Sequence, residues 1–338
     1  MTLLRRTRAG GLDPLRTVVS GGVIPALTLT ATTVGPAVVT IQRITPTGGQ
    51  LTIFWGDGTS TVVAAGVTAA QAHAYAGAGT WTIIATPASR ITRLRILDPL
   101  LSGFHSVQLR GNAITDFICD SIGNAVASVI NSADMVGWTP TTWIFVSMPA
   151  GGTYTIDTAD MVAWNLTASW LLYSMPAGTY TVNSADMVGW TPLNWILFSM
   201  PAGAYTISTA DMVTWNPTIA WQLHSMPGGT YTFTAGIMAN WIYVLNIDAY
   251  SLLDGGVPLT QADVDGILLD IYGSLATRTA VNGIVRVAGT NPAPSGIFQP
   301  AAACPVGALT PGKEIANELL NDGCATGGNV WLTVTFTP

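Results

Sequence analysis

The sequence predicts a mainly β protein built around a central β-solenoid of about 26-residue coils, with a small α/β cap at its C-terminal end. One observation is a set of aspartates and tryptophans that recur at a nearly fixed interval. Another is composition: 49% of residues are hydrophobic and only 9% are charged, against roughly 25% charged residues in typical globular chains. The 338 residues leave room for two or three domains. Stacked repeats suit this composition because each coil buries its apolar side on its neighbours.

Four strong copies of one segment carry the repeat, and a fifth, weaker copy follows around Trp241. Each strong copy contains Ser/Thr-Ala-Asp-Met, then a tryptophan, a second tryptophan that opens an apolar run, Ser-Met-Pro, and a tyrosine. The aligned columns are Asp134, Asp160, Asp186 and Asp211; Trp138, Trp164, Trp190 and Trp215; Trp143, Trp170, Trp195 and Trp221; and Tyr154, Tyr180, Tyr205 and Tyr231.

Each copy predicts a strand, a turn, a second strand and a short helical turn. Runs such as WIFVSMP and WLLYSMP are short, β-prone and end in proline, which is typical of one strand per coil. The hydroxyl residue before Ala-Asp-Met is a helix-start signal, so we expect it to cap one helical turn. Each aspartate is expected to accept hydrogen bonds from the amides of its own turn. One carboxylate per coil is too sparse for calcium, which takes six to eight oxygen ligands.

Side-chain alternation predicts which columns of the first strand face the core. The uniform columns, the tryptophans of that strand and Phe145, Leu172, Leu197 and Leu223, are expected inside. The variable columns are expected outside together with Met148, Met175, Met200 and Met226. An exposed apolar face of several hundred Å² indicates an interaction surface, and cover by the chain's own flanking domains or by neighbouring subunits is an equal alternative. The candidate partner-binding residues on this face are Ile144, Val146, Tyr173, Phe198, Gln222 and His224.

The repeat region resembles leucine-rich repeats, particularly the divergent kind found in phage and bacterial surface proteins. Its period lies within the roughly 20–29 residues of that family. Trp and Leu replace the usual leucines and the asparagine ladder is missing, so a regular horseshoe and a straighter β-solenoid both remain open. Residues 90–130, with alternating apolar positions and LRGNAITDF, are expected to form one or two atypical first coils.

A different pattern precedes the solenoid: WGDGT at 55–59, then HAY at 73–75, then GTWTI at 79–83. These motifs in this order resemble a polycystic-kidney-disease-type (PKD) domain, an immunoglobulin-like β-sandwich, over roughly residues 18–90. Asp57-Gly58 is expected to form a tight hairpin turn. The resemblance implies that His73 is structural and that the domain is a spacer or binding module.

Downstream of the repeats, LTQADVDGILLDIYGSLA predicts a helix. Thr260 and Asp263 form a capping box, and one face is apolar, with Val264, Ile267, Leu268, Ile271 and Leu275. NGIVRVAG predicts a strand, GKEIANELLNDG a helix and VWLTVTF a last strand, and this region resembles the closing segment of repeat proteins of phage and their hosts. The predicted domains are an N-terminal docking arm at 1–17, the sandwich at 18–90, the solenoid at 91–250 and the cap at 251–338.

The basic residues are concentrated near the N-terminus. No Lys or Arg occurs between Arg110 and Arg278, which argues against nucleic-acid binding by the middle of the chain. The N-terminal arginines fit either a solvated tail or an arm that pairs with acids on a neighbour; they are Arg5, Arg6, Arg8 and Arg16. No apolar signal-peptide core follows them, and no stretch reaches the roughly 18 apolar residues of a membrane span.

No catalytic arrangement is recognisable among the three histidines and the scattered carboxylates. G-x-S-x-G, H-E-x-x-H and phosphate-loop motifs are missing from the sequence. Cys119, Cys304 and Cys324 lack metal-ligand spacing, and the last two either pair or stay reduced. We therefore expect a non-enzymatic protein with no catalytic residue, no cofactor and no metal.

Two functions remain. The first is a structural virion protein of a phage, such as a capsid decoration, head fibre or tail-associated protein. It would use the solenoid and the Ig-like domain for assembly and surface display on the particle. Its expected partners are other virion proteins or copies of itself, in a homo-oligomer or larger assembly, with a host surface glycan or protein as a further partner. The alternative is a secreted bacterial adhesin or carbohydrate-binding protein at the cell surface, which needs an export route.

Overall fold

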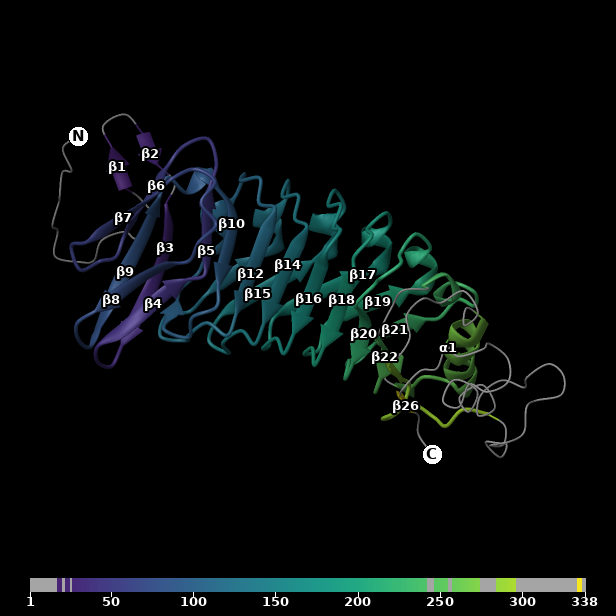
Figure 1. Cartoon of the computed structure of the whole chain (residues 1–338). Helices are drawn as coiled ribbons and strands as arrows, with labels where there is room; N and C mark the ends of the chain where they lie inside the picture. The colour runs from purple at the N-terminus through teal and green to yellow at the C-terminus, as the bar shows by residue number, and fades with distance from the viewer. Residues whose placement is uncertain are drawn as a thin grey trace. The chain divides into compact units, whose positions relative to one another are not determined.

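A computed structural model describes residues 17–19, 22–24, 26–241, 246–254, 257–273, 284–295 and 333–335. Within them the protein is mainly β, as the sequence predicts, with one α-helix in the described part of the C-terminal region (Figure 1). The chain divides into two compact units: the first is Met1–Pro140 with Phe145–Thr155, and the second is Thr141–Ile144 with Ile156–Pro338. The limits of the four domains expected from the sequence stay predictions.

The first unit begins with antiparallel strands. The larger sheet has the order β11-β3-β9-β6-β7, while β4 pairs with β8 and β1 pairs with β2. Alternate residues of the long strands point inward, so that Leu27, Leu29 and Ala31 of β3 are buried. The strands are β1 (Thr17–Val19), β2 (Gly22–Ile24), β3 (Leu27–Thr33), β4 (Ala37–Ile41), β6 (Leu51–Phe54), β7 (Ser60–Val63), β8 (Gln71–Tyr75), β9 (Gly79–Thr86) and β11 (Leu101–Ser102).

The WGDGT segment forms the turn between β6 and β7. Asp57 accepts hydrogen bonds from the amide and hydroxyl of Thr59 at 3.0 and 2.6 Å, and it pairs with His73 Nε2 at 2.7 Å. The Thr59 hydroxyl is the main reason that the pKa of Asp57 falls to about 2. The His73 ring stacks on Trp55 with centroids 5.0 Å apart. His73 therefore holds the turn in place, which agrees with the structural role expected from the sequence.

The atypical first coils predicted for residues 90–130 are present. β10 (Ile91–Ile96) and β12 (Asp116–Asp120) pair in parallel, and the short 3-10 helices η2 (Ser106–Leu109) and η3 (Ser132–Met135) follow the two strands. On the other side of β10 lies β5 (Arg43–Pro46), in antiparallel pairing. A parallel sheet would otherwise begin with an open edge, so β5 protects the start of the coils.

In the second unit each coil gives one strand to each of two parallel sheets (Figure 1). We call the first the tryptophan sheet; its strands are β16 (Ser169–Tyr173), β18 (Asn194–Phe198), β20 (Ala220–His224), β22 (Asn246–Tyr250), β25 (Ile284–Arg286) and β26 (Thr333–Thr335). The second, the tyrosine sheet, contains β17 (Thr179–Asn183), β19 (Ala204–Ser208), β21 (Gly228–Thr232), β23 (Leu253–Asp254) and the antiparallel β24 (Val257–Pro258). The division between the units falls on β14 (Thr142–Val146) and β15 (Thr153–Asp157).

Stacked tryptophans fill the core of the second unit. Trp170 lies directly opposite Trp195, and Trp195 opposite Trp221, in the strand register. Their ring centroids are 5.7 and 5.8 Å apart and their planes differ by 12 and 19°. Neighbouring strands are spaced about 4.8 Å apart, so identical residues in register must stack. The inward placement of the tryptophan column is confirmed, because all three side chains are 0% exposed.

The helical turns differ from the sequence expectation in their capping. They are short 3-10 helices, η4 (Thr158–Met161), η5 (Ser184–Met187) and η6 (Thr209–Met212). The residue before the hydroxyl residue is the N-cap, and its side chain accepts from the amide two positions later, as in Asn183 with Ala185 at 3.2 Å. The expectation that Ser or Thr caps the turn is therefore wrong.

The hydroxyl residue instead links one coil to the next. The Thr158 hydroxyl accepts a hydrogen bond from the backbone N–H of Asn183 at 2.9 Å and donates one to Asp186 Oδ2 at 2.7 Å. Ser184 does the same in the next coil, with the Ser208 amide at 2.8 Å and with Asp211 Oδ2. Asp186 and Asp211 thus accept from the hydroxyl of a neighbouring coil. The expectation that each aspartate accepts from the amides of its own turn is therefore wrong. Each of these buried hydroxyls both accepts and donates, so its own hydrogen-bonding groups are paired.

The methionines of Ser-Met-Pro were expected outside, and this is wrong. Met148, Met175, Met200 and Met226 are only 2–6% exposed. The preceding serines, among them Ser174 and Ser199, have φ of 48°. This left-handed conformation ends the strand, so the alternation that holds up to the serine does not extend to the methionine, which turns into the core.

Consecutive helical turns also alternate in their backbone. Val136 and Val188, which follow the two NSADM copies, have ψ of 128 and 127° and precede glycines with positive φ. Val162 and Val213, which follow the two TADM copies, have ψ of −33 and −30° and stay helical. The turns thus repeat every second coil.

The C-terminal region continues the tryptophan sheet through β25 and β26, which agree with the two predicted strands. The predicted helix is α1 (Gln261–Gly273), and its capping box is present: the Thr260 amide donates to Asp263 and the Asp263 amide to Thr260. The apolar residues of the predicted face are buried, except that Leu275 lies outside the described residues, as do Cys304, Cys324 and the helix expected at 312–323. Within the described part of the chain, no helix is long and apolar enough to cross a membrane.

Candidate interaction surface

The outward residues at the ends of the tryptophan-sheet strands form a column of stacked rings. We call Tyr173, Phe198, His224 and Tyr250 the aromatic column. Successive ring centroids are 4.6, 4.3 and 4.5 Å apart. The planes of the last two pairs differ by only 7 and 10°. All four side chains are half-buried, in line with the outward placement that the sequence predicted for the first three.

Tyr250 was missed by the sequence reasoning because the fifth copy has lost most of the repeat. It lacks the Met-Pro that follows the serine in the other copies. Tyr250 is nevertheless followed by Ser251, whose φ of 53° matches the 51° of Ser225 after His224. The pair of an aromatic residue and a serine was the signal that could have found it.

A second outward column runs beside the rings and changes character along the sheet. Leu171, Ile196 and Gln222 lie in register, and Asp248 and Arg286 follow, although Asp248 is only 1% exposed. Ile144 and Val146 of β14 are half-buried like the other predicted surface residues. The face is therefore apolar in the earlier coils and polar or charged in the later ones.

Two groups at the polar end have shifted pKa values. Burial raises the pKa of Asp248 to about 6, although Arg286 at 3.6 Å and the Tyr250 amide act in the opposite direction. Burial, and secondarily the positive charge of Arg286, lowers the pKa of His224. His224 is thus a neutral ring at pH 7, and its Nδ1 lies 3.0 Å from the Ser225 hydroxyl. A neutral imidazole stacks between Phe198 and Tyr250 without bringing a charge into the column.

The ring geometry limits what this surface can bind. Phe198, His224 and Tyr250 lie nearly parallel with their ring faces against one another, whereas the Tyr173 ring is tilted by 38° from Phe198. A sugar or base that stacks on an aromatic side chain needs a free ring face. The stacked rings together with the half-buried Leu171 and Ile196 form a partly apolar surface, which suits contact with another protein surface.

Other predicted residues are not part of this surface. Arg5, Arg6, Arg8 and Arg16 lie outside the described residues. Among the described residues, no group of three or more His, Cys, Asp or Glu could hold a metal ion. Cys119 is buried, and burial raises the pKa of its thiol, so it is unreactive at neutral pH.

The fold defines a class: a mainly β protein with an antiparallel N-terminal region and a parallel, solenoid-like array of about 26-residue repeats. In comparisons with known proteins, no family model, no curated protein and no solved structure matches the chain.

Proposed function

We propose that the protein is a non-enzymatic structural component of a phage virion, a capsid decoration, head fibre or tail-associated protein. In this role the solenoid and the N-terminal domain serve assembly and surface display. The observation that carries the proposal is the aromatic column, a row of half-buried stacked rings on the outer face of the tryptophan sheet. Such a row suits permanent contact with a neighbouring virion protein or with another copy of the chain.

Details of the N-terminal domain support its assignment as a PKD-type module. The His73 ring lies between the WGDGT turn and Tyr75, whose hydroxyl donates to the Trp55 carbonyl at 2.6 Å. Tyr75 in turn stacks on Trp81 at 4.9 Å. The three motifs that carry the resemblance therefore meet in one cluster, which is what a shared structural signature requires.

The coils are related to leucine-rich repeats in our proposal, with a departure towards a straighter β-solenoid. Each coil of the second unit contributes strands to two parallel sheets. A second regular sheet keeps the spacing of the coils similar on both sides, which favours the straighter alternative. A straight stack presents a flat face, and a flat face can be covered by a flat partner.

The N-terminal arginines fit a docking arm in this proposal. The twelve acidic residues from Asp116 to Asp270 have no Lys or Arg between them in the sequence. Arg110 illustrates how an arginine engages the coils: its Nε donates to Asp134 Oδ1 at 3.0 Å while Asp134 Oδ2 accepts the Ser106 hydroxyl. Asp186 and Asp211 use Oδ2 in the same way. Acidic turns of one copy are thus suited to arginines of a neighbour.

A surface adhesin is the second candidate function. Glycan binding at the aromatic column distinguishes it from the virion protein. Glycan binding through stacking on His224 is disfavoured because Phe198 and Tyr250 stack on its two ring faces. Binding of soluble glycans that is lost on changing Tyr173 or Phe198 would favour the adhesin over the virion protein.

The test is the assembly of the purified chain and its incorporation into particles. Tyr173→Asp and Phe198→Asp place a charge on the aromatic column, and Val188→Asp is a matched control because Val188 is 62% exposed on a helical turn away from it. We expect the two column variants to lose self-association and incorporation while the control keeps both. Sedimentation velocity measures the first and particle composition the second, with circular dichroism to verify folding. Folded column variants that still assemble would overturn the proposal.

A further inference from the structure

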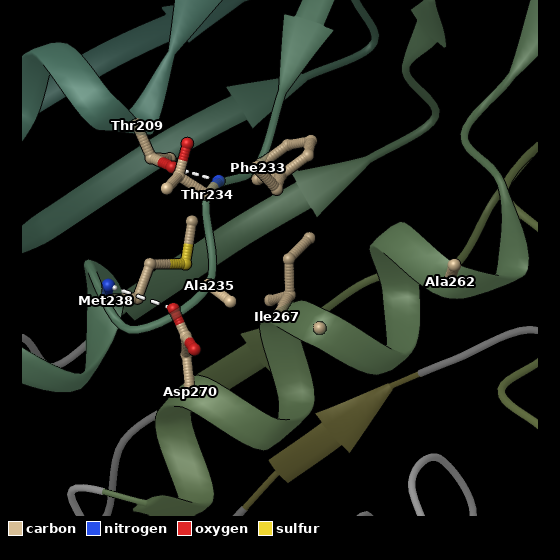
Figure 2. A pocket seen from close by; sticks show the side chains of 9 residues that line it. Thr209, Phe233, Thr234, Ala235, Met238, Ala262, Ile267 and Asp270 are labelled. Atoms are coloured by element: carbon tan, nitrogen blue, oxygen red, sulfur yellow. Dashed lines mark hydrogen bonds between the residues drawn. The ribbon is translucent and has the colours of Figure 1, made fainter.

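Helix α1 and the last helical turns of the solenoid enclose a cavity of about 130 Å³ (Figure 2). Its floor is buried: Thr209, Met238 and Ile267 are each about 1% exposed. Its rim is formed by exposed residues, including Ala235 and Ala262. A buried floor with an accessible rim of small side chains is the form of a site that a small molecule can enter.

The cavity arises where the repeat breaks. In the preceding coil the Ser184 hydroxyl accepts the Ser208 amide and donates to Asp211. Thr209 accepts the Thr234 amide at 2.8 Å, but Ile237 stands where the next aspartate would be. Among the described residues, no acceptor is present for the Thr209 O–H. A buried donor without an acceptor is disfavoured, and this one lines the cavity.

Asp270 of α1 lines the opposite side of the cavity. Its carboxylate accepts the amides of Gly236 at 2.6 Å and Met238 at 3.2 Å, so it holds the helix on the last turn. It does not replace the missing aspartate as an acceptor for Thr209. The cavity thus has a hydrogen-bond donor on one wall and a carboxylate on another, with apolar side chains between them.

Gly266 keeps this space open. It lies inside α1, where glycine is less favourable than alanine. A Cβ built on Gly266 would have no atom within 4 Å, so packing does not demand a glycine here. Any larger side chain would extend into the cavity that Gly266 lines.

We propose that this cavity binds a compact, uncharged molecule with one hydroxyl group, of the short-chain alcohol class. The ligand oxygen accepts from the Thr209 O–H, the buried donor that lines the cavity. The apolar part contacts Phe233, Met238 and Ile267. About five or six heavy atoms fit, since an apolar cavity of about 150 Å³ holds benzene. Such a site goes beyond the assembly role proposed above and does not depend on it.

Isobutanol is a suitable probe, titrated into the full chain labelled with ¹³C at the methionine methyl groups. We expect a saturable shift of the Met238 methyl signal, assigned with Met238→Leu, with a Kd on the order of 1 mM for so few atoms. Thr209→Val, which removes the donor, should weaken binding about five- to tenfold, by the loss of one hydrogen bond. Thr209→Ser keeps the donor and should bind within about threefold of the unchanged chain, because its hydroxyl remains.

Gly266→Leu fills the cavity and should abolish the shift, and Gly266→Ala, which is easily accommodated, should weaken it. The Ala variant keeps the test valid if the Leu variant does not fold. A shift that never saturates, or one that is the same in Thr209→Val and Gly266→Ala as in the unchanged chain, would mean that the cavity holds ordered water only and would overturn the proposal.

Discussion

The two faces of the tryptophan sheet differ although they alternate along the same strands. Inward positions repeat Trp and Leu from β16 to β20, and their side chains are completely buried. Outward positions change from aliphatic to aromatic, polar and charged residues along the same sheet. The inward side is restricted because each tryptophan must stack on the next at a fixed spacing. The outward side changes residue type from strand to strand, so we propose that specificity for a partner belongs there.

The largest expected effect tests the inward side of this comparison. Trp195→Ala removes the middle ring of the stack and leaves a cavity, so we expect a loss of about 3–5 kcal/mol in the free energy of unfolding. Ile196→Ala, the next residue but half-buried on the outward side, should cost roughly 1 kcal/mol. Urea unfolding followed by tryptophan fluorescence and circular dichroism measures both. Equal losses would show that the two faces do not differ in their packing.

The pH dependence of stability tests the later strands of the sheet, where Asp248 lies. The pKa of Asp248 is raised from 3.8 to about 6, so the folded protein binds the proton more tightly than the unfolded chain does. Stability contributed by the protonated form is present below about pH 4 and is lost as the pH rises to about 6, by about 2–3 kcal/mol. Asp248→Asn should remove this dependence. Unfolding measured between pH 4 and 7.5 tests it, and an unchanged pH profile in the variant would contradict the assignment.

The hydrogen bonds that join one coil to the next are expected to contribute an intermediate amount to stability. Ser184→Ala leaves the Ser208 amide and Asp211 without their partner, and we expect a loss of about 1–3 kcal/mol. Ser184→Thr is the matched control because Thr158 fills the same role one coil earlier, and it should be nearly neutral. Thermal unfolding compares them; a Thr variant as unstable as the Ala variant would mean that volume and not the hydroxyl matters.

The smallest expected effect concerns Ser199, which ends strand β18 of the tryptophan sheet. Ser199 has φ of 48°, a conformation that costs a residue with a Cβ about 1 kcal/mol. Ser199→Gly should therefore stabilise the protein by about 0.5 kcal/mol, because relief of that strain exceeds the added freedom of the unfolded chain. Ser199→Val should destabilise it. Calorimetry resolves the two, and a stabilised Val variant would contradict the role given to the left-handed turn.

Much of the fold was predictable because the repeat made each position visible several times. Four copies of the apolar run fixed the strands and the inward tryptophans, and the alternation placed Tyr173, Phe198 and His224 outward. The capping box of Thr260 needed only local hydrogen bonds, so it could be recognised from four residues.

The errors have one physical origin, which is contact between residues far apart in sequence. Thr158 pairs with Asp186, and no local pattern tells a hydroxyl that caps its own turn from one that bonds 28 residues away. The inward methionines depend on a serine in a left-handed conformation, which propensity does not predict for serine. The cavity at Thr209 depends on a helix that begins more than fifty residues later, so only the folded chain brings its walls together.

The alternation of the helical turns bears on how such a chain changes in length. Val136 and Val188 share one backbone conformation while Val162 and Val213 share another, and the phrase NSADMVGWTP recurs 52 residues apart, at 131–140 and 183–192. The repeating unit of turn conformation and sequence is therefore a pair of coils. Gain or loss of one such pair by recombination within the gene keeps every junction between unlike neighbours intact, whereas a single coil would place two like turns in contact. Natural variants of this chain are thus expected to differ in their number of coils by two.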